Sequence, residues 1–579
     1  MESDTKNTSA GSSTEAHSKS SVRVCQNCNN EFVIESDDSA FCEKMKVPSP
    51  TWCPECRMMR RFVWTSGRIL YRQKFDSGEE GITFYPPGNP HKIYSQEKWW
   101  SDEWDPKSFG KEYDFKKSFF EQWLQLFREV PHPTLYTSHT TMINSPWCNG
   151  AADLKNCYLC FRSDFSENCA YTNTMAKNKE CFDVAFTNDS ELCYQAVMAN
   201  KCYRAFWSQD CEDSQDIWFS RDLIGCSNCI GCINLRNKQY HILNQPYTKE
   251  EYAKKLEELN FGSLKNVNDF RARAEKLFLE YPRRQFHGRK NVNVTGDYIF
   301  NSKNVHDSYQ VGNGENIRYG QLLKLGPSKD AYDYTIFGEN SELIYESVWV
   351  GLTVNNIKFS FWNYHAHDLE YSFACHGSGN LFGCVGIRNS EYCILNKQYS
   401  KKDYQDLVGK IKKQMMEVPY IDSRKKEYRY GEYFPAEFSP WAYNETSAYE
   451  FFPISKEEAV SNGYVWRDSD AKEYEPATVS FADDIKDVTD EILGGILKCD
   501  DCGKNYRLVK MELDFYRRMD LPIPRQCPLC RDRVRFKQLN PIKIFSRKCA
   551  KCGKEIETSY APDRQEIVYC ESCYQSEVA

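Results

Sequence analysis

Short apolar clusters recur at regular intervals along the middle of the chain. Between residues 147 and 247, and again between 301 and 400, one or two strand-forming residues follow a polar turn residue about every 9–12 positions. Fixed-period self-similarity indicates a repeat architecture, and Asn and Asp suit its corners because they tolerate left-handed φ. The pattern predicts a mainly β fold with a β-solenoid-like region, in which two of these short units close one coil. An antiparallel meander or sandwich of short strands is the alternative.

The two repetitive stretches are related by a constant shift along the sequence, which we call the repeat shift. It aligns Ile242-Leu243-Asn244, for example, with Ile394-Leu395-Asn396. Each stretch runs into a predicted helix that begins with a capping residue, Thr248 in the first copy and Ser400 in the second. We expect these helices to cover the ends of the repeats, because exposed strand edges promote association between chains.

The duplication also indicates what the central cysteines do. Cys181 falls opposite Ala331 and others fall opposite Val, Ile or Leu, so we expect these thiols to fill a core as small hydrophobes. Cys226, Cys229 and Cys232 are spaced in a way that is compatible with metal binding. Strand alternation would send Cys229 to the face opposite the other two, however, so no metal is predicted there.

The remaining pattern of interest is a set of six C-x-x-C pairs near the two ends. Two such pairs supply the four thiolates of a closed, tetrahedral Zn²⁺ site. Disulfides are disfavoured, because the polar segment 1–22 does not resemble a secretory signal and cytosolic thiols stay reduced. The sequence therefore predicts three structural zinc sites, formed by Cys25, Cys28, Cys53 and Cys56, by Cys499, Cys502, Cys527 and Cys530, and by Cys549, Cys552, Cys570 and Cys573.

The two ends are copies of each other. The ungapped shift that moves Cys25 onto Cys499 also places the other three cysteines of the first group on Cys502, Cys527 and Cys530, and it places Arg57 on Arg531. We call this relationship the ribbon shift. Further along, the N-terminal copy has Phe75, Ser77 or Gly78, Ser95 and Lys98 where the C-terminal copy has its last four cysteines. We therefore expect residues 66–105 to keep the ribbon shape through aromatic packing, without a metal.

Together these patterns divide the chain into consecutive segments. They are a disordered tail (1–22), zinc ribbon 1 (23–65), a metal-free ribbon (66–105), a helical connector (106–146), β-repeat domain 1 (147–247), capping helices (248–282), β-repeat domain 2 (283–400), a capping helix (401–418), an aromatic-rich packed segment (419–467), an acidic linker (468–498), zinc ribbon 2 (499–540) and zinc ribbon 3 (541–579).

Composition and charge narrow the function. The chain has 579 residues and a net charge of −7, and no apolar run approaches the roughly 20 residues that span a membrane. Basic residues nevertheless cluster beside the cysteine pairs, a common footprint of nucleic-acid binding. The alternative is that these cations neutralise the thiolate sites. The candidate nucleic-acid contacts are Arg57, Arg60, Arg61, Arg531, Arg533, Arg535 and Lys537.

No Gly-rich phosphate loop, nucleophile elbow or H-E-x-x-H motif occurs, so an enzyme is not favoured. The leading hypothesis is a non-catalytic, cytoplasmic, zinc-binding protein that contacts nucleic acid or a ribonucleoprotein through its basic ends, with the repeats as a rigid scaffold. A protein–protein interaction scaffold is the alternative. A carbohydrate-active β-solenoid is less favoured, because the sequence does not show which carboxylates lie close together.

Three stretches resemble zinc-ribbon modules: residues 52–61, which begin Trp-Cys-Pro-Glu-Cys-Arg, residues 99–105 and Cys570-x-x-Cys573-Tyr574. Their arrangement over most of the chain resembles a family of uncharacterised zinc-ribbon proteins from candidate-phyla bacteria. The resemblance implies a bacterial, cytoplasmic protein and no particular activity.

Overall fold

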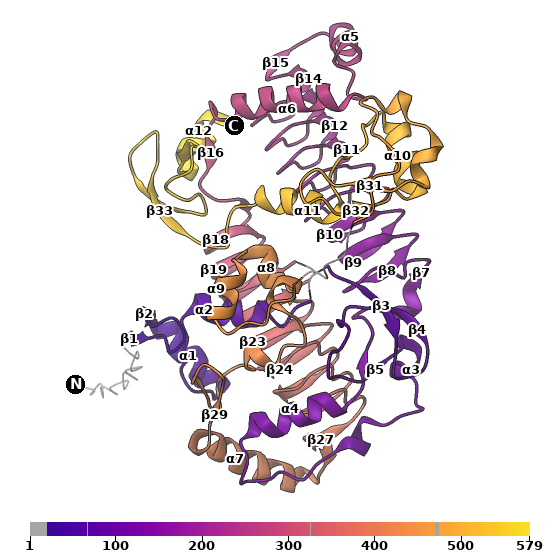
Figure 1. The fold of residues 1–579 in the computed structure, drawn as a ribbon. Coiled ribbons are helices and arrows are strands. Elements are labelled where there is room, and N and C mark those ends of the chain that lie inside the picture. Colours follow the sequence, from indigo (N-terminus) through magenta and orange to yellow (C-terminus); the bar gives the residue numbers. More distant parts are fainter. Residues whose placement is uncertain (1–19, 67, 325, 469–473, 579) are drawn as a thin grey trace, which may run out of the picture.

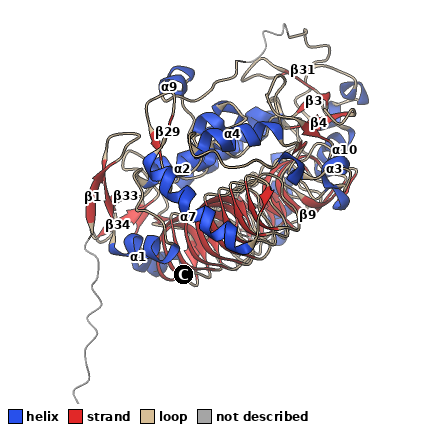
Figure 2. Cartoon of the chain, turned by 90° about the horizontal axis from the view of Figure 1, so that it is seen from below, coloured by secondary structure: helices blue, strands red, loops and turns tan. Residues whose placement is uncertain are grey.

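The computed structural model describes residues 20–66, 68–324, 326–468 and 474–578. The fold is strand-rich, with about 32% strand and 25% helix. Two stacks of short strands follow one another along an elongated body, and most helices gather on one side of the strands (Figures 1 and 2). No described helix is long and apolar enough to cross a membrane. Most of the predicted tail (1–19) and the middle of the predicted acidic linker (469–473) lie outside the described residues.

Stack 1, which we define as residues 137–246, is built by parallel pairing at a constant offset. Ala170 pairs with Tyr158 on one side and with Phe182 on the other, so each repeat unit pairs directly with the next. The parallel pairing rules out an antiparallel meander here. Its strands are β7 (Met142–Ile143), β8 (Ala152–Lys155), β9 (Tyr158–Glu167), β10 (Ala170–Ala176), β11 (Tyr203–Phe206), β12 (Gln215–Trp218), β13 (Ser227–Ile230), β14 (Gln239–Ile242) and β15 (Gln245–Pro246).

Stack 2, residues 288–398, repeats this arrangement as one 12-stranded sheet. Ile357 pairs with Leu369, and Leu369 pairs with Leu381, again in parallel. Its strands are β17 (Gly288–Arg289), β18 (Val292–Phe300), β19 (Lys303–Gly312), β20 (Gly314–Arg318), β21 (Gln321–Leu323), β22 (Ser328–Phe337), β23 (Ser341–Val350), β24 (Val354–Lys358), β25 (His367–Glu370), β26 (Gly379–Phe382), β27 (Glu391–Ile394) and β28 (Lys397–Gln398).

The backbone of stack 1 turns at every third residue. From Asp153 to Leu243 every third position has a positive φ, and from Leu154 to Cys232 the residue after each such position is buried. Four such three-residue segments (triplets) make one repeat unit, and each unit forms one complete layer, or rung, of the stack. The expectation that two units close one coil is therefore wrong. Cys226, Cys229 and Cys232 each follow such a turn and are all at most 1% exposed. The predicted alternation is also wrong, because triplet turns, unlike an extended strand, send all three inward.

The narrow rung explains the central cysteines. The interior of stack 1 is filled by small side chains, and Cys157, Cys169, Cys181 and Cys193 lie in its hydrophobic core. The expectation that these thiols act as small hydrophobes is confirmed. The corresponding core of stack 2 uses larger residues such as Ile344.

Helices cap the ends of both stacks. Helix α5 (Lys249–Leu259) begins at Thr248, whose hydroxyl accepts from the Glu251 N–H, and α7 (Lys401–Glu417) begins in the same way at Ser400. Tyr252 and Tyr404 are the buried residues that pack against the last strands, 5.7 Å and 5.8 Å from the rings of Tyr240 and Tyr392. A second helix, α6 (Leu264–Phe278), follows α5.

The rest of the chain packs around the stacks. Helix α4 (Phe119–Glu129) lies in the predicted helical connector, and its Trp123 donates to the carbonyl of Tyr371 in stack 2 at 3.0 Å. The other helices and strands are β1 (Ser21–Val24), β2 (Glu31–Ile34), α1 (Ser36–Met45), α2 (Pro54–Phe62), β3 (Tyr71–Lys74), β4 (Glu80–Thr83), β5 (Ile93–Tyr94), α3 (Gln96–Trp100), β6 (His132–Pro133), β16 (Arg283–Arg284), β29 (Tyr420–Ile421), β30 (Glu427–Tyr428), α8 (Ser447–Phe451), α9 (Lys456–Ser461), β31 (Leu497–Lys498), β32 (Asn505–Tyr506), α10 (Lys510–Met519), α11 (Pro528–Lys537), β33 (Phe545–Lys548), β34 (Glu555–Thr558), β35 (Val568–Tyr569) and α12 (Glu571–Val578).

Candidate metal centres

The twelve paired cysteines come together in the three predicted groups of four. Within each group the sulfur atoms all lie within 4.8 Å of one another. The construction is the same in all three: one pair sits in the turn after a strand, and the other begins a helix. Cys53 and Cys527, for example, are the N-caps of α2 and α11, each followed by Pro in the first helical position.

The sulfur spacing fits zinc. Four sulfurs at about 2.3 Å from a tetrahedral Zn²⁺ lie about 3.8 Å from one another. The Sγ–Sγ distances are 3.8 Å between Cys28 and Cys53, 3.7 Å between Cys502 and Cys527, and 3.8 Å between Cys552 and Cys570. A disulfide would require about 2.0 Å, and all of these cysteines are free thiols. The geometry suits three zinc ions, with no open coordination position.

Backbone N–H groups favour the thiolate form that zinc needs. The Cys570 N–H donates to Cys549 Sγ at 3.2 Å, and the Cys527 N–H donates to Cys499 Sγ at the same distance. Burial opposes ionisation, but these and neighbouring N–H groups outweigh it and lower the pKa of Cys499 to about 7 and that of Cys549 to about 6.

Within residues 68–105, no side chain belongs to a group that could hold a metal in the described structure. β3 and β4 form an antiparallel hairpin. The Ser95 N–H donates to Ser77 Oγ at 2.9 Å, whereas the N–H of its counterpart Cys570 donates to the sulfur of Cys549. Phe75 and Trp99 are buried. Aromatic packing thus accompanies the loss of the thiolates.

Five of the seven predicted nucleic-acid contacts are in fact buried. Arg57, Arg60, Arg61, Arg531 and Arg535 are each at most 3% exposed, and all five form salt bridges with carboxylates. The prediction that these five reach a phosphate is wrong, because their guanidinium groups are enclosed and already paired. Arg533 and Lys537, on the same helix α11, are exposed.

The buried arginines instead fasten the zinc ribbons to the stacks, and they do so crosswise (Figure 1). Arg57 and Arg61 of zinc ribbon 1 both pair with Asp333 in stack 2, each at 2.8 Å. Arg531 and Arg535 of zinc ribbon 2 both pair with Asp183 in stack 1, at 3.2 Å and 2.7 Å. The N-terminal ribbon therefore lies on the C-terminal stack, and the C-terminal ribbon lies on the N-terminal stack.

Aromatic stacking repeats the same symmetry. Phe41 stacks on Tyr332 with ring centroids 4.0 Å apart, and Phe515, its counterpart under the ribbon shift, stacks on Phe182 at 4.3 Å. The shift therefore relates the docking contacts as well as the cysteines.

Burial alone would lower the pKa of Arg57, but the Asp333 carboxylate outweighs it and raises that pKa well above its usual value.

Sequence reasoning missed the partners of these arginines. Asp183 and Asp333 occupy positive-φ corners of their stacks, in the same register that sets Cys181 opposite Ala331. The available signal in the sequence was that both the arginines of the ribbons and the aspartates of the stacks are duplicated. Both aspartates form buried salt bridges with arginine, so neither is free to act in a glycosidic site.

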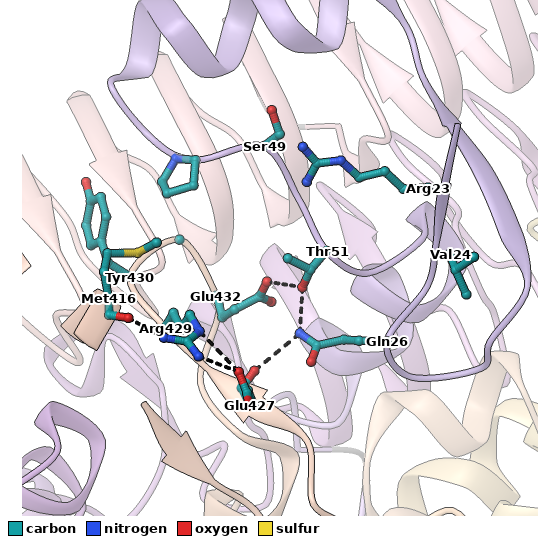
Figure 3. A pocket seen from close by; sticks show the side chains of 12 residues that line it. Arg23, Val24, Gln26, Ser49, Thr51, Met416, Glu427, Arg429, Tyr430 and Glu432 are labelled. Carbon is teal, nitrogen blue, oxygen red and sulfur yellow. Dashed lines mark hydrogen bonds and ion pairs between the residues drawn. The ribbon is translucent and has the colours of Figure 1, made fainter. Parts of the chain in front are cut away.

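Zinc ribbon 1 also borders a cavity of about 380 Å³ against residues 416–432 (Figure 3). The carboxylate of Glu432 accepts from the Thr51 hydroxyl and from Arg60, the latter at 2.7 Å. Gln26 bridges Thr51 and the carbonyl of Glu427. The Glu432 carboxylate thus neutralises Arg60 where zinc ribbon 1 meets residues 416–432.

No protein-family model matches the chain, and no similar protein was found among curated proteins. The class defined by the fold and the sites is therefore a strand-rich protein with three zinc-ribbon-like Cys₄ modules.

Proposed function

We propose that the chain is a non-catalytic, zinc-binding scaffold that binds nucleic acid, alone or within a ribonucleoprotein. The observation that carries this proposal is the basic surface that remains after the buried arginines are set aside. Arg533, Lys537, Lys548 and Lys554 of zinc ribbons 2 and 3 are exposed, and among the described residues none has a carboxylate within salt-bridge distance. Exposed, unpaired cations of this kind attract phosphates.

In this proposal the two stacks are β-solenoids that arose by duplication and serve as the rigid support. Parallel pairing of each repeat unit with the next supports the solenoid assignment. The repeat shift, together with the duplicated docking contacts, supports the duplication. The three zinc ions hold the ribbons that the arginines fasten to this support.

The test is binding of fluorescently labelled 20-nucleotide single-stranded RNA, single-stranded DNA and duplex DNA at about 50 mM salt, where electrostatic binding is strongest. We expect binding that weakens with salt, and that weakens further in the double variant Arg533→Glu/Lys537→Glu while three zinc ions remain bound. Absence of binding to all three probes would reject the proposal and favour the protein–protein scaffold.

A further inference from the structure

A cleft runs between helix α6, zinc ribbon 2 and stack 1. It consists of two cavities of about 220 and 200 Å³ that share Gln195, Trp207, Arg271 and Val534 as lining residues. Because the two cavities share lining residues from α6, zinc ribbon 2 and stack 1, they adjoin each other along α6, and we call them together the groove. The groove is distinct from the zinc sites, although residues of zinc ribbon 2 line one wall.

Two arginines in this groove lack partners. Arg271 and Arg525 line it, and neither side chain forms a hydrogen bond or salt bridge with any residue that the structure describes. The Nε atom of Arg525 is buried without a hydrogen-bond partner among the described residues. Buried donors without acceptors are costly, so this wall is suited to an added acceptor.

The groove also holds an aromatic surface. Trp207 is half-buried and lies parallel to Phe219, with ring centroids 5.0 Å apart and planes at 8°. The guanidinium of Arg271 lies 5.9 Å from the Trp207 ring. Two carboxylates, Asp500 and Glu275, line the groove as well, and neither is within salt-bridge distance of the arginines in the described structure. A planar ring beside guanidinium groups matches a base with its phosphate.

The cavity beside zinc ribbon 1 is the counterpart of this groove, and there a carboxylate of the chain accepts hydrogen bonds from the ribbon. The ribbon shift relates Gln26, Pro48 and Thr51, which line the cavity of Figure 3, to Asp500, Pro522 and Arg525, which line the groove. In zinc ribbon 1 the carboxylate of Glu432 accepts from Arg60 and Thr51. In zinc ribbon 2, Val534 stands at the position of Arg60, and the segment after the capping helix is α6, which contributes Arg271.

We propose that this groove binds one nucleotide of a single-stranded nucleic acid. The phosphate oxygens accept from Arg271 and Arg525, in the role that Glu432 plays at the other ribbon, and the base stacks on Trp207. The inference rests on the proposed function and gives it a specific site.

The test is the salt dependence of binding to a labelled 20-nucleotide poly(U) RNA, with wild type, Arg271→Ala/Arg525→Ala, Trp207→Ala and the control Arg273→Ala. Arg273 lies on the same helix and is exposed outside the groove. Loss of the one phosphate contact should reduce the magnitude of the slope of log K against log salt by about 0.7 in the double variant. Trp207→Ala should weaken binding about tenfold with the slope unchanged. Arg273→Ala should behave like wild type.

The two proposals fail differently. If wild type binds none of the three probes of the proposed function, that function fails. If it binds duplex DNA alone, the proposed function stands and the groove assignment is overturned. If wild type binds and the groove variants match Arg273→Ala, with three zinc ions bound in all, the groove assignment is overturned. Photocrosslinking of 4-thiouridine RNA to the wild-type protein gives an independent readout that needs no variant. Crosslinks should map to residues 195–221 or to α6, and crosslinks confined elsewhere would also overturn it.

Discussion

Arg535 and Asp183 form a fully buried salt bridge of 2.7 Å across 352 residues of chain. Asp183 also pairs with Arg531 at 3.2 Å, so one carboxylate neutralises two guanidinium groups at the seam between zinc ribbon 2 and stack 1. Such a pair contributes little net stability when intact, because both charges have lost their hydration. Removal of one partner is costly, because it leaves the other charge buried and unpaired.

Asp183→Ala should therefore lower the free energy of unfolding by about 3–5 kcal/mol, measured by urea denaturation. The matched control is Glu180→Ala, on the same rung, whose partner Arg518 is half-exposed. An exposed pair contributes at most about 1 kcal/mol. Equal effects of the two substitutions would contradict the role assigned to the buried seam.

Metal analysis of the purified protein should give three zinc ions per chain. Cys549→Ser/Cys552→Ser should reduce this to two, because the other clusters share no ligand with the third. Ser95→Ala should leave the count at three. A fourth zinc ion in the wild type would contradict the metal-free interpretation of residues 66–105.

His132 should make stability fall in acid. Burial lowers its pKa from 6.5 to about 4, while its Nε2 lies 2.7 Å from the Phe127 carbonyl and its Nδ1 lies 3.2 Å from the Tyr85 hydroxyl. The unfolded chain takes up a proton below about pH 6.5 and the folded chain does not, so stability is lost as pH falls from about 6.5 to about 4, by about 3 kcal/mol in total.

The check is a series of urea denaturation curves between pH 4.5 and pH 7.5 for wild type and His132→Gln. Zinc loss in acid affects both proteins, so the difference between them isolates the imidazole. We expect a shallower pH dependence in the variant. Parallel curves would show that His132 does not titrate between the two states as described.

The narrow interior of stack 1 should reject large side chains. Cys181 is fully buried in a core of small residues. Cys181→Leu should destabilise the protein by about 1–3 kcal/mol through overpacking. In stack 2, the large-to-small substitution Ile344→Cys should be destabilising through a cavity instead. A neutral Cys181→Leu would mean that the rung widens easily.

The sequence allowed accurate prediction of features set by local spacing. The C-x-x-C pairs, the capping residues Thr248 and Ser400 and the Asn- and Asp-rich corners each depend on residues a few positions apart, and they form as expected. The triplet turn was missed because residues such as Phe165 and Trp207 occupy positive-φ positions that Asn and Asp normally occupy. Neighbouring rungs impose this conformation, and no local pattern reveals it.

The arginines beside the zinc ligands could not be assigned from sequence for a related reason. The sequence of a basic cluster does not show whether its side chains face solvent or pair with a carboxylate hundreds of residues away. Arg57 and Asp333 are 276 residues apart, so only the folded chain shows that they are partners. The duplication of both charges was informative only in combination with the crossed arrangement of the two halves.

The crossed arrangement has a consequence for biosynthesis. Zinc ribbon 1 leaves the ribosome long before its docking surface exists, because 276 residues separate Arg57 from Asp333. At about 5–20 residues per second, this interval lasts on the order of tens of seconds. During this interval Arg57, Arg60 and Arg61, which are buried in the folded protein, are exposed to water and to anions. The nascent chain therefore has a positively charged surface that is buried after folding.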